Sequence, residues 1–222
     1  MFEKNIPTPE RLRITLCLSL VGGFLETYTY RLHGGVFANA QTGNLVLLAL
    51  SLVQGSNKAL SYLIPIIAFV LGVFASEKIC ERLGNSSRLH WLSALVMLEA
   101  AVLAVVPFFP ASTPDGVVIV LVSFVSSLQF NGFQRTHGMA CSTVVCTANL
   151  RSACKHLYHA LTKKDFETAL SSAKYLFIIG FFVLGACISF WAIELWGKSS
   201  IWLCSIMLVI VHFILVITER SK

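Results

Sequence analysis

Charged residues are scarce in this sequence. Asp, Glu, Lys and Arg make up 13% of its 222 residues, about half the share found in soluble domains. Hydrophobic residues make up 56%, and the mean hydropathy is +0.76. This composition excludes a disordered chain and argues against an ordinary soluble globule. Because the apolar residues come in long blocks, the predicted solvent of the fold is a lipid bilayer.

Motifs for catalysis, metal binding and nucleotide binding are also missing. None of the seven cysteines forms a CxxC pair or a Cys/His pair with zinc spacing, and there is no HExxH motif. A Ser/His/Asp set, paired aspartates and a nucleotide motif are absent as well. We therefore expect no enzyme activity, no metal and no cofactor. The formal charge of +6 comes from basic residues between apolar blocks, so we expect no nucleic-acid partner.

Eight apolar blocks follow one another along the chain. Six are long enough, or nearly so, to cross a hydrocarbon core of about 30 Å as helices. The second and sixth are too short, because their clean apolar runs are only Leu45–Leu50 and Val144–Cys146. These two are predicted to be half-helices, re-entrant segments or interfacial segments. The blocks are Leu12–Tyr30, Val36–Val53, Ala59–Ser76, Leu89–Phe109, Gly116–Phe133, Met139–Leu150, Ala173–Trp196 and Ile201–Ile217.

The two halves of the chain repeat each other. Phe69–Gly72 recurs as Phe182–Gly185, and several flanking residues recur at the same spacing. At a shorter spacing, Thr42–Leu45 recurs as Thr147–Leu150. The change of spacing predicts a longer loop in the second half, around Tyr158–Ser172. We expect one membrane domain over residues 1–222, with repeat one at about 12–109 and repeat two at about 116–217.

The duplication predicts a topology. If the short blocks do not cross, each repeat holds three crossings, and an odd number places the second repeat upside down relative to the first. With the N-terminus inside, every Lys and Arg except Arg31, Lys58 and Lys198 falls on the inner side, as the positive-inside rule favours. The predicted fold class is an all-α integral membrane protein. It has about six transmembrane helices in two inverted three-helix repeats, each with a short broken or re-entrant helix.

At particular motifs the chain resembles the YoaK-like family of small bacterial multi-pass membrane proteins, a domain of unknown function. The resemblance covers essentially the whole chain, and it implies a bacterial inner-membrane protein with both termini in the cytoplasm. Glu26 stands where the family usually has Asp, and Ala148 replaces the Gly of the second motif. The family implies no agreed activity. The motifs are Gly23–Glu26, Gly34–Leu45, Gln129–Asn131 with Arg135, and Thr147–Leu150.

The Thr-x-Asn motifs precede the two short helices. Thr and Asn are good N-caps, and Gly43 would let the chain turn sharply into its helix. Two helix N-termini that begin inside the bilayer and converge on one site would bind an anionic or dipolar solute. The alternative is that these residues only cap buried breaks. Because a carboxylate at membrane depth is costly, Glu26 is either a proton or cation site, opposite Asn131, or a structural group hydrogen-bonded to Thr27, Thr29 or nearby backbone.

The resulting set of candidate residues is large. Gln129 and Asn131 place two amides in one apolar helix, and both need partners. The predicted substrate-binding residues are Glu26, Asn39, Thr42, Gly43, Asn44, Gln129, Asn131, Thr147 and Asn149.

Further polar residues in the apolar blocks have both a structural and a functional interpretation. Glu99 and His212 would pair if their helices meet, or would be structural. The residues that follow the first helix of each repeat would attract anions to the entrances or reach lipid headgroups; they are Arg31, His33, Arg135 and His137. Gly72 and Gly185 are predicted to permit close helix packing.

Two functions are consistent with the sequence. The first is a transporter or channel for a small, anionic or dipolar solute, with Glu26 as the candidate group for proton coupling. The second is a membrane binding or scaffold protein that transports nothing. In both cases the lipid bilayer is the surrounding partner. A second copy of the chain is a plausible partner as well, because a 24.4 kDa bundle leaves much apolar surface.

Overall fold

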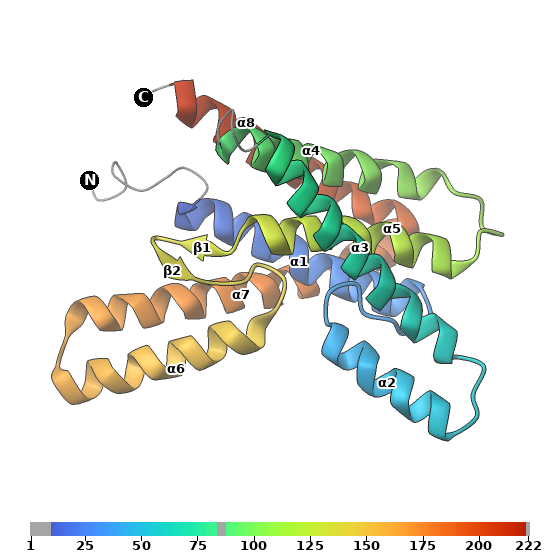
Figure 1. The fold of residues 1–222 in the computed structure, drawn as a ribbon, viewed down its shortest axis with the longest axis horizontal. Helices are drawn as coiled ribbons and strands as arrows, with labels where there is room; N and C mark the ends of the chain where they lie inside the picture. Colours follow the sequence, from blue (N-terminus) through green and yellow to red (C-terminus); the bar gives the residue numbers. More distant parts are fainter. Residues whose placement is uncertain (1–9, 84–87, 221–222) are drawn as a thin grey trace.

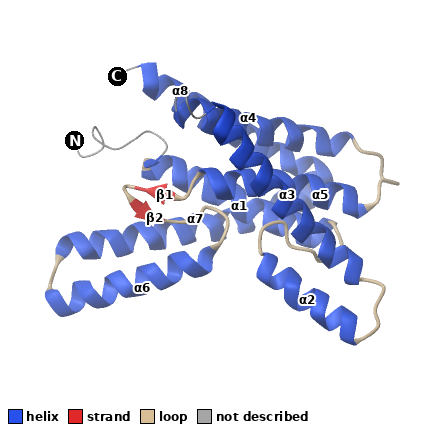
Figure 2. Cartoon of the chain, viewed as in Figure 1, coloured by secondary structure: helices blue, strands red, loops and turns tan. Residues whose placement is uncertain are grey.

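The computed structural model describes residues 10–83 and 88–220, which are almost entirely helical (Figures 1 and 2). A two-stranded ribbon is the only β-structure among these residues. The prediction of a helical protein is confirmed. The helices are α1 (Leu12–Leu32), α2 (Gln41–Val53), α3 (Ala59–Leu83), α4 (Arg88–Val105), α5 (Asp115–Gly132), α6 (Cys146–Lys163), α7 (Phe166–Trp196) and α8 (Trp202–Arg220), and the strands are β1 (Arg135–Thr136) and β2 (Met139–Ala140).

Four stretches of the described residues are long and apolar enough to cross a membrane. The first lies in α3, the second runs through α4 and the 3₁₀ turn after it (Trp91–Phe108), and the third is α5. The fourth runs over 52 residues from Phe166 to Ile217 and contains both α7 and α8. Together with the short apolar α2, these stretches account for most of the exposed hydrophobic side chains, which is the surface expected of helices in lipid.

Glycines allow the central helices to pack at very short distances. α1 lies in the middle of the bundle and packs along α7, while α3 packs along α5 (Figure 1). A Cβ atom on Gly23 would lie 1.9 Å from the carbonyl oxygen of Phe182, and one on Gly185 would lie 2.0 Å from that of Leu20. A Cβ on Gly72 would lie 2.4 Å from the Phe124 carbonyl oxygen of α5. The packing role predicted for Gly72 and Gly185 is confirmed.

The segment that contains α2 starts and ends at the same end of the bundle. His33, just after α1, and Lys58, just before α3, line one pocket. Between them the chain turns at Gly34 and Gly35, whose φ values are +72° and +73°. It then reaches Asn39, which contacts Glu26 in the second half of α1, before α2 runs back outwards.

The second half differs from the prediction at residues 158–172. Instead of a long loop, α6 continues to Lys163 and α7 begins at Phe166, so the extra residues lengthen two helices. The break between them is tight. Lys164 has a positive φ of 51°, and the Asp165 side chain accepts a hydrogen bond from the Glu167 backbone N–H as the N-cap of α7. Strong helix formers in α6 and this cap favour a helical hairpin over a loop.

The ribbon β1–β2 was not predicted from the sequence. Arg135 pairs with Ala140 and Thr136 with Met139, and the two connecting residues, His137 and Gly138, both have positive φ. Two positive φ values are typical of a type I′ hairpin turn. The apolar block expected at Met139–Leu150 therefore splits into strand, loop and the start of α6.

Candidate functional site

The site is built on two matching loops, each of which leads into one of the short helices. Asn44 is the fourth residue of α2, and its side chain accepts a hydrogen bond from the Phe37 N–H (3.1 Å) and donates one to the Phe37 carbonyl (2.8 Å). Asn149 is the fourth residue of α6, and it bonds the N–H and carbonyl of Ser142 at 3.0 and 2.6 Å. Both asparagines are fully buried. Each one fixes the shape of the loop before its helix.

The prediction that Thr and Asn cap these helices is wrong. The N-cap residues are Ala40 and Val145, and neither uses a side chain as a cap. Thr42 and Thr147 lie in the first helical turns with exposed side chains. The asparagines point back to the preceding loop because its backbone groups are buried and need partners there.

Gly43 also plays a different part from the one predicted. It lies within α2 and is not among the glycines with positive φ, since Gly34 and Gly35 make the turn. A Cβ on Gly43 would come within 3.0 Å of the Phe37 ring. The absence of a side chain at this position therefore leaves room for that ring. Ala148, at the matching place in α6, is helical and exposed, which explains why the second motif needs no glycine.

Glu26 lies in α1 at the point where the first loop reaches the middle of the bundle. It is 7% exposed, and its Oε1 accepts a hydrogen bond from the Asn39 N–H at 3.1 Å. The neighbouring amides of Ala38 and Ala40 also interact with this carboxyl group. Oε2 is buried and has no hydrogen-bond partner among the described residues. The loop therefore presents a cluster of N–H donors to one half-satisfied carboxyl group.

Asn39 adds two more unsatisfied atoms to this place. Its side chain is 2% exposed, and neither Oδ1 nor Nδ2 has a partner among the described residues. Gln41, which was not predicted, supports the same loop: its Nε2 donates to the Ala38 carbonyl and its Oε1 accepts from Asn44. A buried amide without partners is costly, so Asn39 marks a place where a ligand or water would be stabilised.

The second loop meets α1 from the other side. Gln129 of α5 is 1% exposed, and its Nε2 donates to the Leu18 carbonyl (3.1 Å) and to the Thr143 hydroxyl (2.8 Å), while its Oε1 has no partner in the described part. Thr143 also packs its carbonyl against Gly22. Cys146, at the start of α6, lies near Glu26. Both loops thus converge on one stretch of α1.

Asn131 does not belong to this cluster. Its Nδ2 donates to the Ser76 hydroxyl (3.2 Å) and to Glu77 Oε1 (2.6 Å), which places it against the last part of α3. The prediction that Asn131 faces Glu26 across one site is therefore not what the structure shows. Glu26 of α1 contacts the loop before α2, whereas Asn131 of α5 contacts α3.

Of the two interpretations of Glu99 and His212, the pair is wrong. His212 Nδ1 hydrogen-bonds to the Ser93 hydroxyl at 2.7 Å. Glu99 is 1% exposed, and both of its oxygens lack a partner among the described residues. The two residues lie on α4 and α8, which do pack together, but at different levels along them.

An ion pair and a histidine–carboxylate hydrogen bond connect the end of α1 near α2 to its neighbours. Arg31 Nη2 lies 2.8 Å from Glu194 Oε1 of α7, and His33 Nδ1 lies 2.8 Å from Asp115 Oδ1 of α5. At the opposite end, His137 lies 3.5 Å from the Lys174 amine. The basic residues predicted at the first end therefore make protein contacts there.

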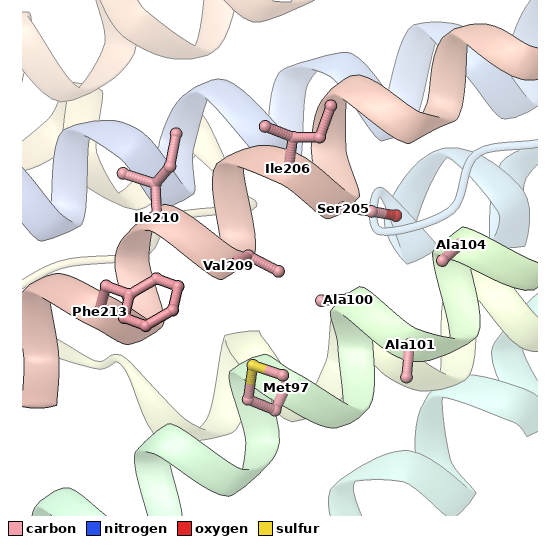
Figure 3. Close-up of a pocket in the computed structure, with 9 residues that line it drawn as sticks. All are labelled: Met97, Ala100, Ala101, Ala104, Ser205, Ile206, Val209, Ile210 and Phe213. Carbon is pink, nitrogen blue, oxygen red and sulfur yellow. The ribbon is translucent and has the colours of Figure 1, made fainter.

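The central polar residues are packed, and larger spaces lie elsewhere. One is a groove of about 410 Å³ between α4 and α8, lined by apolar side chains and the Ser205 hydroxyl (Figure 3). Such a groove suits lipid rather than a polar solute. Within the described part of the chain, no group of three or more His, Cys, Asp or Glu side chains is placed to hold a metal ion.

Long apolar helices around a small buried polar cluster define a multi-pass α-helical membrane protein. The chain belongs to the family described as "Protein of unknown function (DUF1275)", which matches residues 14–214. It is similar to "UPF0700 transmembrane protein YoaK" of Bacillus subtilis (strain 168), at 28% identity over 160 residues that cover 67% of this chain and 70% of that protein. The YoaK-like resemblance is thereby confirmed. No solved structure matches the chain.

Proposed function

We propose that this protein is a transporter or channel for a small polar solute, with its binding site at Glu26, Asn39 and Gln129. The observation that carries the proposal is a set of buried atoms along the Leu18–Glu26 stretch of α1 that have no partner among the described residues: Glu26 Oε2, both polar atoms of the Asn39 side chain, and Gln129 Oε1. A solute with hydrogen-bonding groups would satisfy them. The cluster contains donors and acceptors but no activated nucleophile, so we assign it to binding rather than to catalysis.

The proposed architecture is six crossings in two inverted triplets, α1, α3 and α4 followed by α5, α7 and α8. Three features support it. The matching asparagine loops occur once in each half. The pairing of α1 with α7 and of α3 with α5 is what a two-fold exchange of the halves would produce. In addition, α2 has 13 residues, about 20 Å of helix, too short to cross about 30 Å of hydrocarbon.

The proposed orientation places the end with His33, Lys58 and Lys198 outside a bacterial plasma membrane. The opposite end carries most basic residues, and α1 begins and α8 ends there (left in Figure 1). The α6–α7 hairpin also points that way. Because α7 has 31 residues, about 46 Å of helix, its first turns extend beyond the hydrocarbon on this inner side.

Reconstitution in liposomes tests the function. Flux would be measured for amino acids, carboxylates, phosphate, sugars and protons, the last with a pH-sensitive dye inside the vesicles. We expect at least one flux, lost in Glu26→Gln and in Asn39→Ala and retained in Glu81→Gln, whose side chain is exposed at the end of α3. A folded protein that neither moves nor binds any of these solutes would overturn the proposal.

Cysteine labelling tests the topology separately. In a background without the native cysteines, Cys at Gly35 and Cys at Leu52 should react with a membrane-impermeant maleimide from the same side. Cys at Met139 and Cys at Tyr158 should both react from the opposite side. Labelling of the two members of either pair from opposite sides would show that the short helix crosses the membrane.

One observation favours the second function, a scaffold that transports nothing. The α6–α7 hairpin carries large exposed apolar side chains next to basic ones, including Leu161 at 72% and Phe166 at 77% exposure. A partner that copurifies in fixed ratio, and is lost when Lys155 and Lys163 are replaced by Gln, would support this function, provided that flux is absent.

A further inference from the structure

A polar pocket lies at the proposed outer end, away from the central cluster. Its volume is about 360 Å³, and it lies between the loop after α1, the start of α3 and the start of α5. The polar residues in its wall are His33, Asn57, Lys58, Ser61, Tyr62 and Asp115. His33 and Asp115 also line a second space of about 210 Å³, so their side chains form the partition between the two.

The partition is held by a hydrogen bond that leaves one ring nitrogen unused. His33 Nδ1 and Asp115 Oδ1 are 2.8 Å apart, and this contact fixes the imidazole ring. His33 Nε2 is buried and has no partner among the described residues. The side chain of Asp115 is 56% exposed, and its second oxygen, Oδ2, makes no hydrogen bond within the part of the chain that the structure describes.

Three other residues that line the pocket have polar side chains that the fold does not use. Lys58, Ser61 and Tyr62 make no side-chain hydrogen bond or ion pair with any described residue. In contrast, Lys198 at the same end donates to the Phe109 carbonyl. The pocket lining thus contains an ammonium group and a carboxylate, which do not form an ion pair with each other.

We propose that this pocket binds a small zwitterion of the α-amino acid type. The solute carboxylate would lie against the Lys58 amine and the Tyr62 hydroxyl, and its ammonium group against Asp115 Oδ2. Both contacts are charge-assisted, which makes them stronger than neutral hydrogen bonds. The buried residues Val36 and Ile119 also line the pocket, and its volume leaves room for a short apolar side chain. This site stands apart from the transport function, because binding here can be measured without flux.

Equilibrium binding to purified protein in detergent free of phospholipid tests the proposal, by calorimetry and thermal shift. The probes are glycine, alanine, serine and proline, with propionate as the anion-only control and ethylamine as the cation-only control. We expect binding of at least one amino acid and of neither control. Lys58→Gln and Asp115→Asn should each weaken it about tenfold to a hundredfold. Lys155→Gln, exposed on α6, should leave it unchanged.

Tyr62→Phe removes a single hydroxyl and keeps the ring, so it tests the site even if a charge variant folds poorly. It should weaken binding severalfold without lowering the melting temperature of the free protein. Absence of amino-acid binding, equal binding of propionate, or unchanged affinity in Tyr62→Phe and Lys58→Gln would each overturn the proposal. A Lys58-dependent shift with a short-chain phosphatidylglycerol, and none with amino acids, would assign the pocket to a lipid headgroup instead.

Discussion

Asn44 and Asn149 hold the same position in two helices that lie far apart in the sequence. Each is the fourth residue of its helix, and each side chain bonds both backbone groups of the residue seven places earlier. These two loops bring buried polar atoms from both halves of the chain to one stretch of α1.

Replacing either asparagine by Ala should destabilise the protein by about 1–3 kcal/mol, because two buried backbone groups lose their partners. Unfolding in detergent micelles, followed by circular dichroism, measures the effect. Gln54→Ala, at the exposed end of α2, is the control and should change little. Equal stability of Asn44→Ala and Gln54→Ala would show that the loop does not depend on this residue.

Two glycines of α7 form a matched pair for a packing test. Gly185→Ala should cost about 1–3 kcal/mol, since the added Cβ would lie 2.0 Å from the backbone of α1 and the helices would have to separate. Gly180→Ala has open space around it and should be neutral or raise stability by up to about 1 kcal/mol. Thermal unfolding of both variants in the same detergent measures the two changes in stability. Similar losses in the two would argue against close α1–α7 packing.

We expect the carboxyl group of Glu26 to stabilise the fold because it accepts the hydrogen bond from the Asn39 N–H. Glu26→Gln keeps an oxygen that accepts the Asn39 N–H, so it should fold with a melting temperature near that of the wild type. Glu26→Leu removes the acceptor from a buried N–H and should lower the free energy of unfolding by about 1–3 kcal/mol. If Gln and Leu prove equally stable, the Asn39 contact does not hold the loop.

The cap of α7 should depend on pH. The Thr168 hydroxyl and the Glu167 N–H hydrogen-bond to Asp165 and keep the pKa of its carboxyl below the usual value. A lowered pKa in the folded state means that the cap is fully stabilising above the unfolded-state pKa and loses this effect as the pH falls through the folded-state pKa. Asp165→Ala should speed hydrogen exchange at the start of α7 at neutral pH, and the difference from wild type should shrink in acid.

The exchange experiment has its own control. Peptides from the middle of α7 should exchange at the same rate in both proteins, because a cap acts on the first turn of its helix. A difference between the proteins that is as large at low pH as at neutral pH would contradict a role for the ionised carboxylate.

Sequence reasoning located the polar residues better than it located their contacts. Glu26, Asn39, Asn44, Gln129 and Asn149 were all expected to be buried at a site, and the structure buries them all. Thr143 was missed, because a lone Thr in a loop carries no pattern. Asn131 was assigned to the wrong neighbour, since a repeat shows which positions match but not which face of a helix meets which partner.

Composition and block length by themselves determined that the chain is helical and embedded in a membrane. The reason is that long apolar helices satisfy their own backbone groups in lipid. The repeat determined that two short helices correspond to each other. Which buried groups meet was decided only by the tertiary structure. The close approach of α1 to α7 and the return of two loops to α1 depend on contacts between residues far apart in the chain, and local sequence patterns do not specify such contacts.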